Sequence, residues 1–147
     1  MPVSHFLADD DATAAFAARV AAMLQPGDLV LLEGDLGAGK SALARGIIRT
    51  LARDPRMEVP SPSFALVQPY TVAGWTVLHA DLYRLQEAGE VEELGLLENQ
   101  QALVLVEWPD RAPQLRSRAT VLIAMAIPAG GAGRTATIEV VDGRVIR

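Results

Sequence analysis

Residues 34–41 read Gly-Asp-Leu-Gly-Ala-Gly-Lys-Ser, "GDLGAGKS", and match the phosphate-loop pattern G-x-x-x-x-G-K-[S/T] at every fixed position. An apolar run typical of a buried strand, residues 29–34, leads into the motif, and helical spacing of apolar residues follows it over residues 41–53. A strand, a glycine loop and a helix in this order direct backbone N–H groups and the positive end of the helix toward an anion. The stretch therefore predicts a nucleotide-phosphate site.

Lys40 is the only lysine of the chain, because the other twelve of the 13 basic residues are arginines. In a phosphate loop, lysine supplies a compact charge to the β- and γ-phosphates, whereas the planar guanidinium of arginine is larger and does not fit the same tight turn. A sequence that uses arginine elsewhere thus keeps lysine where geometry excludes the exchange. This favours a functional loop over a glycine-rich turn with a chance lysine.

The rest of the sequence alternates helix-like and strand-like segments. In chain order we expect a helix over residues 12–24 after the acids at 9–11, and then strands over residues 64–70 and 75–83 joined by a turn at Ala73-Gly74. One or two short helices over residues 87–99 and a strand over residues 102–108 follow. The last elements are two strands around a glycine-rich turn within residues 119–141. This pattern predicts an α/β fold. We expect one domain over residues 1–147, a P-loop NTPase-like three-layer sandwich with a mixed parallel and antiparallel central sheet.

The composition restricts the classes of function. The chain has 147 residues, a net charge of −5 and no cysteine, which excludes a disulfide framework and a thiolate metal site. It has no apolar run long enough to cross a membrane and no signal-like start, so we expect a cytoplasmic protein without membrane contact. Arg45, Arg49 and Arg53 recur at four-residue spacing, and this pattern favours a solvated helix face over a nucleic-acid site.

Two acids stand at the ends of predicted strands. Asp81 closes "TVLHAD" and Glu107 closes "ALVLVE", and ligands of α/β folds gather at the carboxyl ends of such strands. An acid on a neighbouring strand is needed to hold Mg²⁺ near the phosphates, and Ser41 can supply a hydroxyl ligand. We therefore expect Lys40, Asp81 and Glu107 to act in catalysis, whereas Glu33 is expected to be structural. Which of Asp81 and Glu107 orients the attacking water stays open.

Two other side chains near these acids are expected to be structural. Trp108 directly follows Glu107, and His79 lies two residues before Asp81. A tryptophan beside a strand end is usually a packing residue, and a histidine within a strand is more often a core or surface imidazole than a catalytic one. Neither is predicted to act in the site.

Four segments together resemble the TsaE (YjeE) family of bacterial P-loop ATPases. They are "GDLGAGKS", "VPSPSFALVQPY", "LHADLYRL" and "LVLVEWPDR", in this order in a short chain, and the resemblance extends from about residue 10 onward. It implies Mg²⁺ bound by Ser41 and Glu107, a role for Asp81 in hydrolysis, and nucleotide contacts at the N-terminal segment and the C-terminal hairpin. The implied nucleotide-binding residues are Asp10, Gly37, Ala38, Gly39, Lys40, Ser41, Ala42 and Arg134.

The resemblance also implies a cellular role. Members of this family bind and hydrolyse ATP in support of the TsaD and TsaB subunits, which make N6-threonylcarbamoyladenosine at position 37 of tRNAs that decode ANN codons. The acidic balance of the present chain suggests that tRNA is contacted mainly through these partners. Three positions depart from the family pattern: Ser63 replaces a common threonine but keeps a hydroxyl for a polar contact in a switch-like loop, Ala42 lacks a second hydroxyl, and Ala80 replaces an aromatic residue.

Two other functions remain open from the residues alone. A small P-loop kinase acting on a metabolite would share the phosphate loop, but the chain has little room for an acceptor domain and an arginine-rich lid. A nucleotide-gated binding module would bind ATP without meaningful hydrolysis. The appearance of phosphate on a small acceptor would favour the first, and partner function that survives the loss of hydrolysis would favour the second.

Overall fold

Within the described residues 2–62, 64–144 and 146 of the computed structural model, seven strands form a single sheet in the order β1-β7-β6-β2-β5-β4-β3. The strands are β1 (Val3–Leu7), β2 (Leu29–Glu33), β3 (Val67–Val72), β4 (Trp75–Asp81), β5 (Leu103–Glu107), β6 (Val121–Ala126) and β7 (Arg134–Val140). Strand β2 pairs in parallel with β5 and β6, and β4 pairs in parallel with β5. The outer pairs, β1–β7, β6–β7 and β3–β4, are antiparallel. The mixed central sheet is confirmed.

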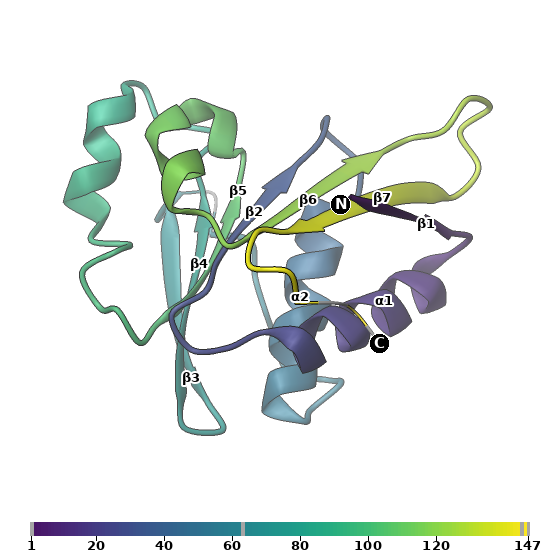
Figure 1. Cartoon of the computed structure of the whole chain (residues 1–147), viewed down its shortest axis with the longest axis horizontal. Coiled ribbons are helices and arrows are strands. Elements are labelled where there is room, and N and C mark those ends of the chain that lie inside the picture. Colours follow the sequence, from purple (N-terminus) through teal and green to yellow (C-terminus); the bar gives the residue numbers. More distant parts are fainter. Residues whose placement is uncertain (1, 63, 145, 147) are drawn as a thin grey trace.

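Helices cover the two faces of the sheet differently (Figure 1). The α-helices α1 (Asp10–Met23) and α2 (Lys40–Ala52) pack together on one face. Three 3₁₀ segments, η1 (Ala88–Leu94), η2 (Pro109–Arg111) and η3 (Pro113–Arg118), cover the other face. The third layer of the predicted sandwich is therefore built of short 3₁₀ turns rather than α-helices.

The first four residues of strand β2, residues 29–32, are all apolar because both faces of the strand are covered. Leu29 and Leu31 pack with the 3₁₀ segments, whereas Val30 and Leu32 pack with α1 and α2. Successive side chains of a strand point to opposite faces, so a strand that is covered on both faces needs apolar residues at every position. Burial on both faces fixes β2 at the centre of the sheet, where it delivers the phosphate loop to the sheet edge.

The other strands that carry predicted site residues end at the same edge. In the register of the sheet, Glu107 on β5 lies beside Leu32 on β2 and beside Asp81 on β4. These three strands run parallel, so their carboxyl ends converge next to the loop that follows β2. The topology thus brings Asp81 and Glu107 to the phosphate loop, although 66 residues separate Glu107 from Ser41 in the chain.

Several elements depart from the sequence expectations. Strand β1 was not predicted, because its alternation is short and its outward side chains are exposed, with Phe6 at 62%. Strand β3 begins at Val67, later than expected, since Leu66 has a positive φ of 67° and its N–H donates to Pro62 O. The turn at Ala73-Gly74 is confirmed, with positive φ at both residues, as a two-residue hairpin loop requires. Ser63, the predicted switch-loop residue, lies outside the described residues.

No helix in the described part of the chain is both long and apolar enough to cross a membrane.

Candidate nucleotide-binding site

The phosphate loop, residues 34–39, links β2 to α2, and its glycines adopt conformations that other residues avoid. Gly34, Gly37 and Gly39 have φ of 145°, 83° and 105°. Helix α2 begins at Lys40, and Gly39 precedes it with no side chain to cap the first turn. The N–H groups at the start of α2 and its positive helix end thus form an anion-binding site.

Lys40 is folded back onto its own loop. Its side-chain nitrogen Nζ donates to Gly34 O at 2.5 Å and to Asp35 O at 3.0 Å. The same nitrogen lies 4.1 Å from the centre of the Trp108 ring, a distance at which the ring face attracts a cation. Lys40 is only 4% exposed, so the loop encloses the one lysine of the chain.

Burial lowers the pKa of Lys40 from its ordinary value of 10.5, and the nearby carboxylates of Glu107, Asp81, Asp35 and Asp110 partly oppose this shift. The acids surround the ammonium group with negative charge, but they do not fully offset its removal from water. A bound polyphosphate would add the negative charge needed to offset the burial of the Lys40 ammonium group.

Ser41, Glu107 and His79 form a short chain of hydrogen bonds. Ser41 Oγ donates to Glu107 Oε1 at 2.7 Å, and His79 Nε2 lies 2.6 Å from Glu107 Oε2. Glu107 and His79 are 2% and 1% exposed. Both oxygens of the carboxylate are thus held, one from α2 and the other from β4.

Asp81 lies beside this chain on the same edge of the sheet. It is 6% exposed, and its Oδ1 accepts a hydrogen bond from Tyr83 N at 3.0 Å. A cavity of about 380 Å³ brings Asp81 together with Lys40, Ser41 and Glu107. The cavity is also lined by Leu36, Gly37, Gly39, Ala42, Ser61, Tyr83, Arg84 and Trp108. The three residues predicted to be catalytic, Lys40, Asp81 and Glu107, therefore share one cavity, which we call the phosphate cavity.

The oxygen donors of this cavity fit a magnesium ion bound together with phosphate. The hydroxyl of Ser41 and the carboxylate of Glu107 are hard ligands, 2.7 Å apart, and Mg²⁺ is commonly held by one or two such groups plus substrate phosphates and water. Among the described residues, no group of three or more His, Cys, Asp or Glu side chains could hold a metal ion by protein ligands alone. Such an ion would depend on the nucleotide for its remaining ligands.

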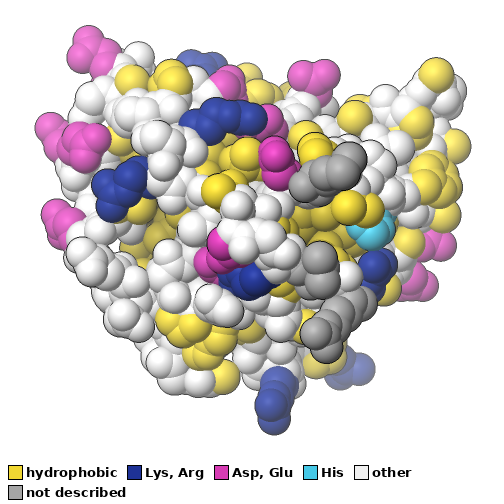
Figure 2. All heavy atoms as spheres, viewed as in Figure 1, with side chains coloured by type: hydrophobic (Ala, Val, Ile, Leu, Met, Phe, Trp, Pro, Cys, Tyr) yellow, Lys and Arg dark blue, Asp and Glu magenta, His cyan; other side chains and the backbone are white. Residues whose placement is uncertain are grey.

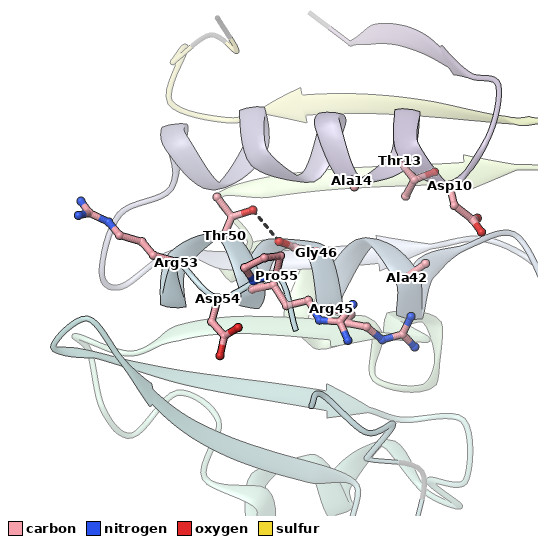
Figure 3. A pocket seen from close by; sticks show the side chains of 11 residues that line it. Asp10, Thr13, Ala14, Ala42, Arg45, Gly46, Thr50, Arg53, Asp54 and Pro55 are labelled. Atoms are coloured by element: carbon pink, nitrogen blue, oxygen red, sulfur yellow. Dashed lines mark hydrogen bonds between the residues drawn. The ribbon is translucent and has the colours of Figure 1, made fainter. Parts of the chain in front are cut away.

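A second cavity of about 470 Å³ runs between α1 and α2 (Figure 3). Asp10, at the start of α1, and Ala42, on α2, lie at one end of it, and Arg53 lies at the other. Ala42 also lines the phosphate cavity, so the two cavities share a wall. Arg45, Arg49 and Arg53 all line the cavity between the helices, rather than forming only a solvated face.

Two further residues predicted to contact the nucleotide, Arg134 and Ala38, lie differently relative to the phosphate loop. Arg134, on β7, donates from Nε to Gly37 O at 3.1 Å and so reaches the phosphate loop from the far end of the chain. Ala38 is different, because its side chain is buried and its N–H donates to Asp35 O at 3.0 Å. The structure thus brings Arg134 to the loop and turns Ala38 inward. Glu33, expected to be structural, pairs with Arg116 at the surface.

Sequence reasoning missed three residues that line or support the phosphate cavity. His79 bonds to Glu107, Trp108 lies over Lys40, and Arg84 lines the cavity with its guanidinium 4.5 Å from the centre of the Phe64 ring. The expectation that Trp108 only packs is incomplete, because its ring also lies over Lys40 Nζ. Its backbone has a positive φ of 57°, which is a strained conformation for a large residue. A signal for His79 was present: it lies two residues before Asp81, hence on the same face of its strand.

The arrangement of β2, the glycine loop, Lys40 and α2 defines a P-loop NTPase-like fold. The structure is similar to a crystal structure of YdiB from Bacillus subtilis, with a TM-score of 0.72 and 25% identity over 96% of this chain and 86% of that one. The family model described as "Threonylcarbamoyl adenosine biosynthesis protein TsaE" matches residues 7–136. The chain therefore belongs to the TsaE family.

Curated relatives agree with this assignment. A "tRNA threonylcarbamoyladenosine biosynthesis protein TsaE" from Rickettsia conorii is 40% identical over 107 residues, which cover 72% of this chain and 61% of that protein. The protein with the same description from Synechocystis is 38% identical over 122 residues, or 79% of this chain and 76% of that protein. The match therefore spans less than two thirds of the length of the Rickettsia protein.

Proposed function

We propose that this chain is a magnesium-dependent ATPase that supports the formation of N6-threonylcarbamoyladenosine at position 37 of tRNAs decoding ANN codons, in the cytoplasm. The membership of the chain in the TsaE family supports the pathway. One observation carries the activity: Lys40, Asp81 and the bonded pair of Ser41 and Glu107 line a single cavity at the phosphate loop.

Phosphoryl transfer requires positioning and charge neutralisation rather than covalent chemistry by the protein. The N–H groups at the start of α2 bind phosphate oxygens, and Lys40 brings its positive charge to the β- and γ-phosphates. Ser41 and Glu107 would hold the magnesium ion, and the bound ion would neutralise charge on those phosphate oxygens. Asp10, Ala42 and Arg134 hold the rest of the nucleotide, with Asp10 and Ala42 at one end of the cavity between the helices.

The geometry favours a division of labour between the two acids. Both oxygens of Glu107 already have partners, Ser41 and His79, so this carboxylate is suited to hold the metal in a fixed orientation. Asp81 lies beside it in register and lines the same cavity. We therefore assign to Asp81 the orientation of the attacking water, which in P-loop enzymes is a task of a single polar side chain.

The rim of the phosphate cavity supports a role for protein partners. Leu36 and Tyr83 line the cavity and are 74% and 43% exposed, and Phe64, which is in contact with Arg84, is 87% exposed. Large exposed apolar side chains around a site are typical of a surface that another protein covers. TsaD and TsaB are the proposed partners, and a cation supplied by a partner would accelerate hydrolysis.

The surface charge supports an indirect contact with tRNA. Figure 2 shows acidic side chains along the side of the molecule where the 3₁₀ segments lie, and further acidic side chains at the top and on the right. Segment η1 alone contains Glu90, Glu92 and Glu93, and the whole chain carries a net charge of −5. Since RNA binding depends on neutralising phosphates with basic residues, the partners are proposed to carry the main contact with tRNA.

The test is the rate of phosphate release from ATP by the wild-type protein, alone and with purified TsaD and TsaB. We expect slow release alone and faster release with the partners. Asp81→Asn lowers the rate about 100-fold, because loss of water orientation affects the chemical step, while ATP affinity measured by calorimetry stays within about threefold, a change of less than 1 kcal/mol.

Glu93→Gln is the matched control, since Glu93 is an exposed acid on η1 that does not line the phosphate cavity and is not among the acids near Lys40. It should hydrolyse ATP like the wild type. Equal rates with and without partners would contradict the proposed stimulation. Transfer of phosphate to a small acceptor would instead identify a kinase, and full partner activity of the Asp81→Asn protein would identify a nucleotide-gated binding module.

A further inference from the structure

We propose that His79 is a positioning residue, which holds the carboxylate of Glu107 in the orientation that binds magnesium together with nucleotide. The inference rests on the proposed function and adds to it a residue for which the sequence predicted only a structural role. His79 does not line the phosphate cavity, so it acts through Glu107 rather than on the nucleotide.

The register of the sheet explains how His79 reaches Glu107. His79 on β4 lies beside Leu105 on β5, two residues before the neighbouring pair of Asp81 and Glu107. Side chains two residues apart share a face of a strand, so His79, Asp81 and Glu107 all project toward the face that carries α2. From this position His79 Nε2 approaches Glu107 Oε2 to 2.6 Å.

The hydrogen-bonding roles follow from the chemistry of the carboxylate. An ionised carboxylate only accepts, so Nε2 carries the hydrogen and donates it to Oε2. The other oxygen, Oε1, accepts from Ser41 Oγ at 2.7 Å. His79 thus fixes one oxygen and leaves the other directed at Ser41, the second proposed magnesium ligand. A carboxylate held at one oxygen by a buried donor has little freedom to rotate away from the metal.

The second nitrogen of His79 argues against a role in packing alone. Among the described residues, Nδ1 of His79 is a buried polar atom without a hydrogen-bond partner, and His79 lies beside the apolar core residue Leu105 in the register of the sheet. A buried polar atom without a partner costs stability, and an apolar side chain of similar volume would avoid this cost. The imidazole is therefore disadvantageous for packing, and its bond to Glu107 is the contact that accounts for it.

The experiment compares the affinity for ADP in excess Mg²⁺ with the affinity in EDTA, measured by isothermal titration calorimetry. The ratio of the two affinities isolates the contribution of the metal, and ADP avoids turnover. In His79→Leu we expect the ratio to fall about 10- to 100-fold, as is usual when the partner of a metal ligand is removed. The affinity for ADP in EDTA should stay within about threefold of the wild-type value. His79→Gln, whose amide can replace the Nε2 donor, should retain most of the ratio.

Two further variants complete the design. His79→Asn has an amide too short to reach Oε2, so it should behave like His79→Leu. This variant keeps the test decisive if the leucine variant does not fold. His5→Gln is the matched control, because the only other histidine of the chain packs against Phe16 away from the site. Its ratio should equal that of the wild type.

The possible failures are distinguishable. A ratio that is unchanged in both His79→Leu and His79→Asn would overturn the positioning role, as would an equal loss of affinity in Mg²⁺ and in EDTA. A loss in His79→Gln as large as that in His79→Leu would show that the donor at Nε2 is not what matters, and would overturn it too. Failure of the wild type to bind ADP in either condition would instead reject the proposed function.

Discussion

We expect Lys40→Arg to lower the affinity for ATP about 10- to 100-fold. This is the range expected when a charged hydrogen-bonding group no longer reaches its partner. The change preserves the charge, so the loss comes from geometry. Lys40 is enclosed by two carbonyl oxygens and the ring of Trp108, and it is only 4% exposed. A planar guanidinium needs more width and a different arrangement of partners than an ammonium group.

The measurement is calorimetric titration of each variant with ATP in excess magnesium. Lys40→Ala should lose as much affinity as Lys40→Arg, because neither supplies a cation at the right place. Arg118→Lys is the reverse exchange at an exposed position of η3, and it should leave the affinity unchanged. Wild-type affinity in Lys40→Arg would show that the loop tolerates arginine, and would remove the explanation for the single lysine.

Gly34→Ala destabilises the protein by roughly 2–5 kcal/mol, the sum of a left-handed backbone for a residue with a side chain and of overpacking against a rigid neighbour. Gly34 has a φ of 145°, and a Cβ built there would lie 2.4 Å from Met125 O, a backbone atom of β6. Because β6 is held between β2 and β7 in the sheet, the phosphate loop must shift. We expect the loss in chemical denaturation, together with weaker ATP binding.

Gly37→Ala in the same loop separates the two causes. Gly37 also has a positive φ, 83°, but a Cβ there would meet nothing within 4 Å. It should therefore show only the conformational cost, about 1–2 kcal/mol. Equal destabilisation by both substitutions would mean that the contact with β6 contributes nothing, and that conformation alone requires glycine at the start of the loop.

The features that the sequence predicted well depend on local patterns. The strand, glycine loop and helix around residues 29–53 are contiguous, so the motif and its flanks determine them together. Asp81 and Glu107 could also be anticipated, because each ends an apolar strand and parallel strands bring such ends to one edge. Their convergence follows from topology, without knowledge of any side-chain contact.

The features that it missed depend on register and on side-chain packing between distant segments. The bond between His79 and Glu107 requires β4 and β5 to pair with Asp81 beside Glu107, and nothing in either strand alone specifies this. Trp108 lies over Lys40 because its backbone turns with a positive φ directly after β5, which a sequence pattern does not reveal. Strand β1 was missed because an exposed edge strand carries few buried residues to mark it.

The contacts of Lys40 also bear on how the nucleotide leaves. The ammonium group has two carbonyl oxygens and an aromatic face as neighbours. In the proposed ATPase, phosphate would replace these neighbours when it binds, and they would return to Lys40 when it leaves. Binding and release of phosphate would thus exchange one set of partners of Lys40 for another. The buried ammonium group would keep a partner throughout. In the proposed ATPase this exchange would lower the affinity for phosphate, because the bonds of Lys40 to Gly34 and Asp35 must be broken first.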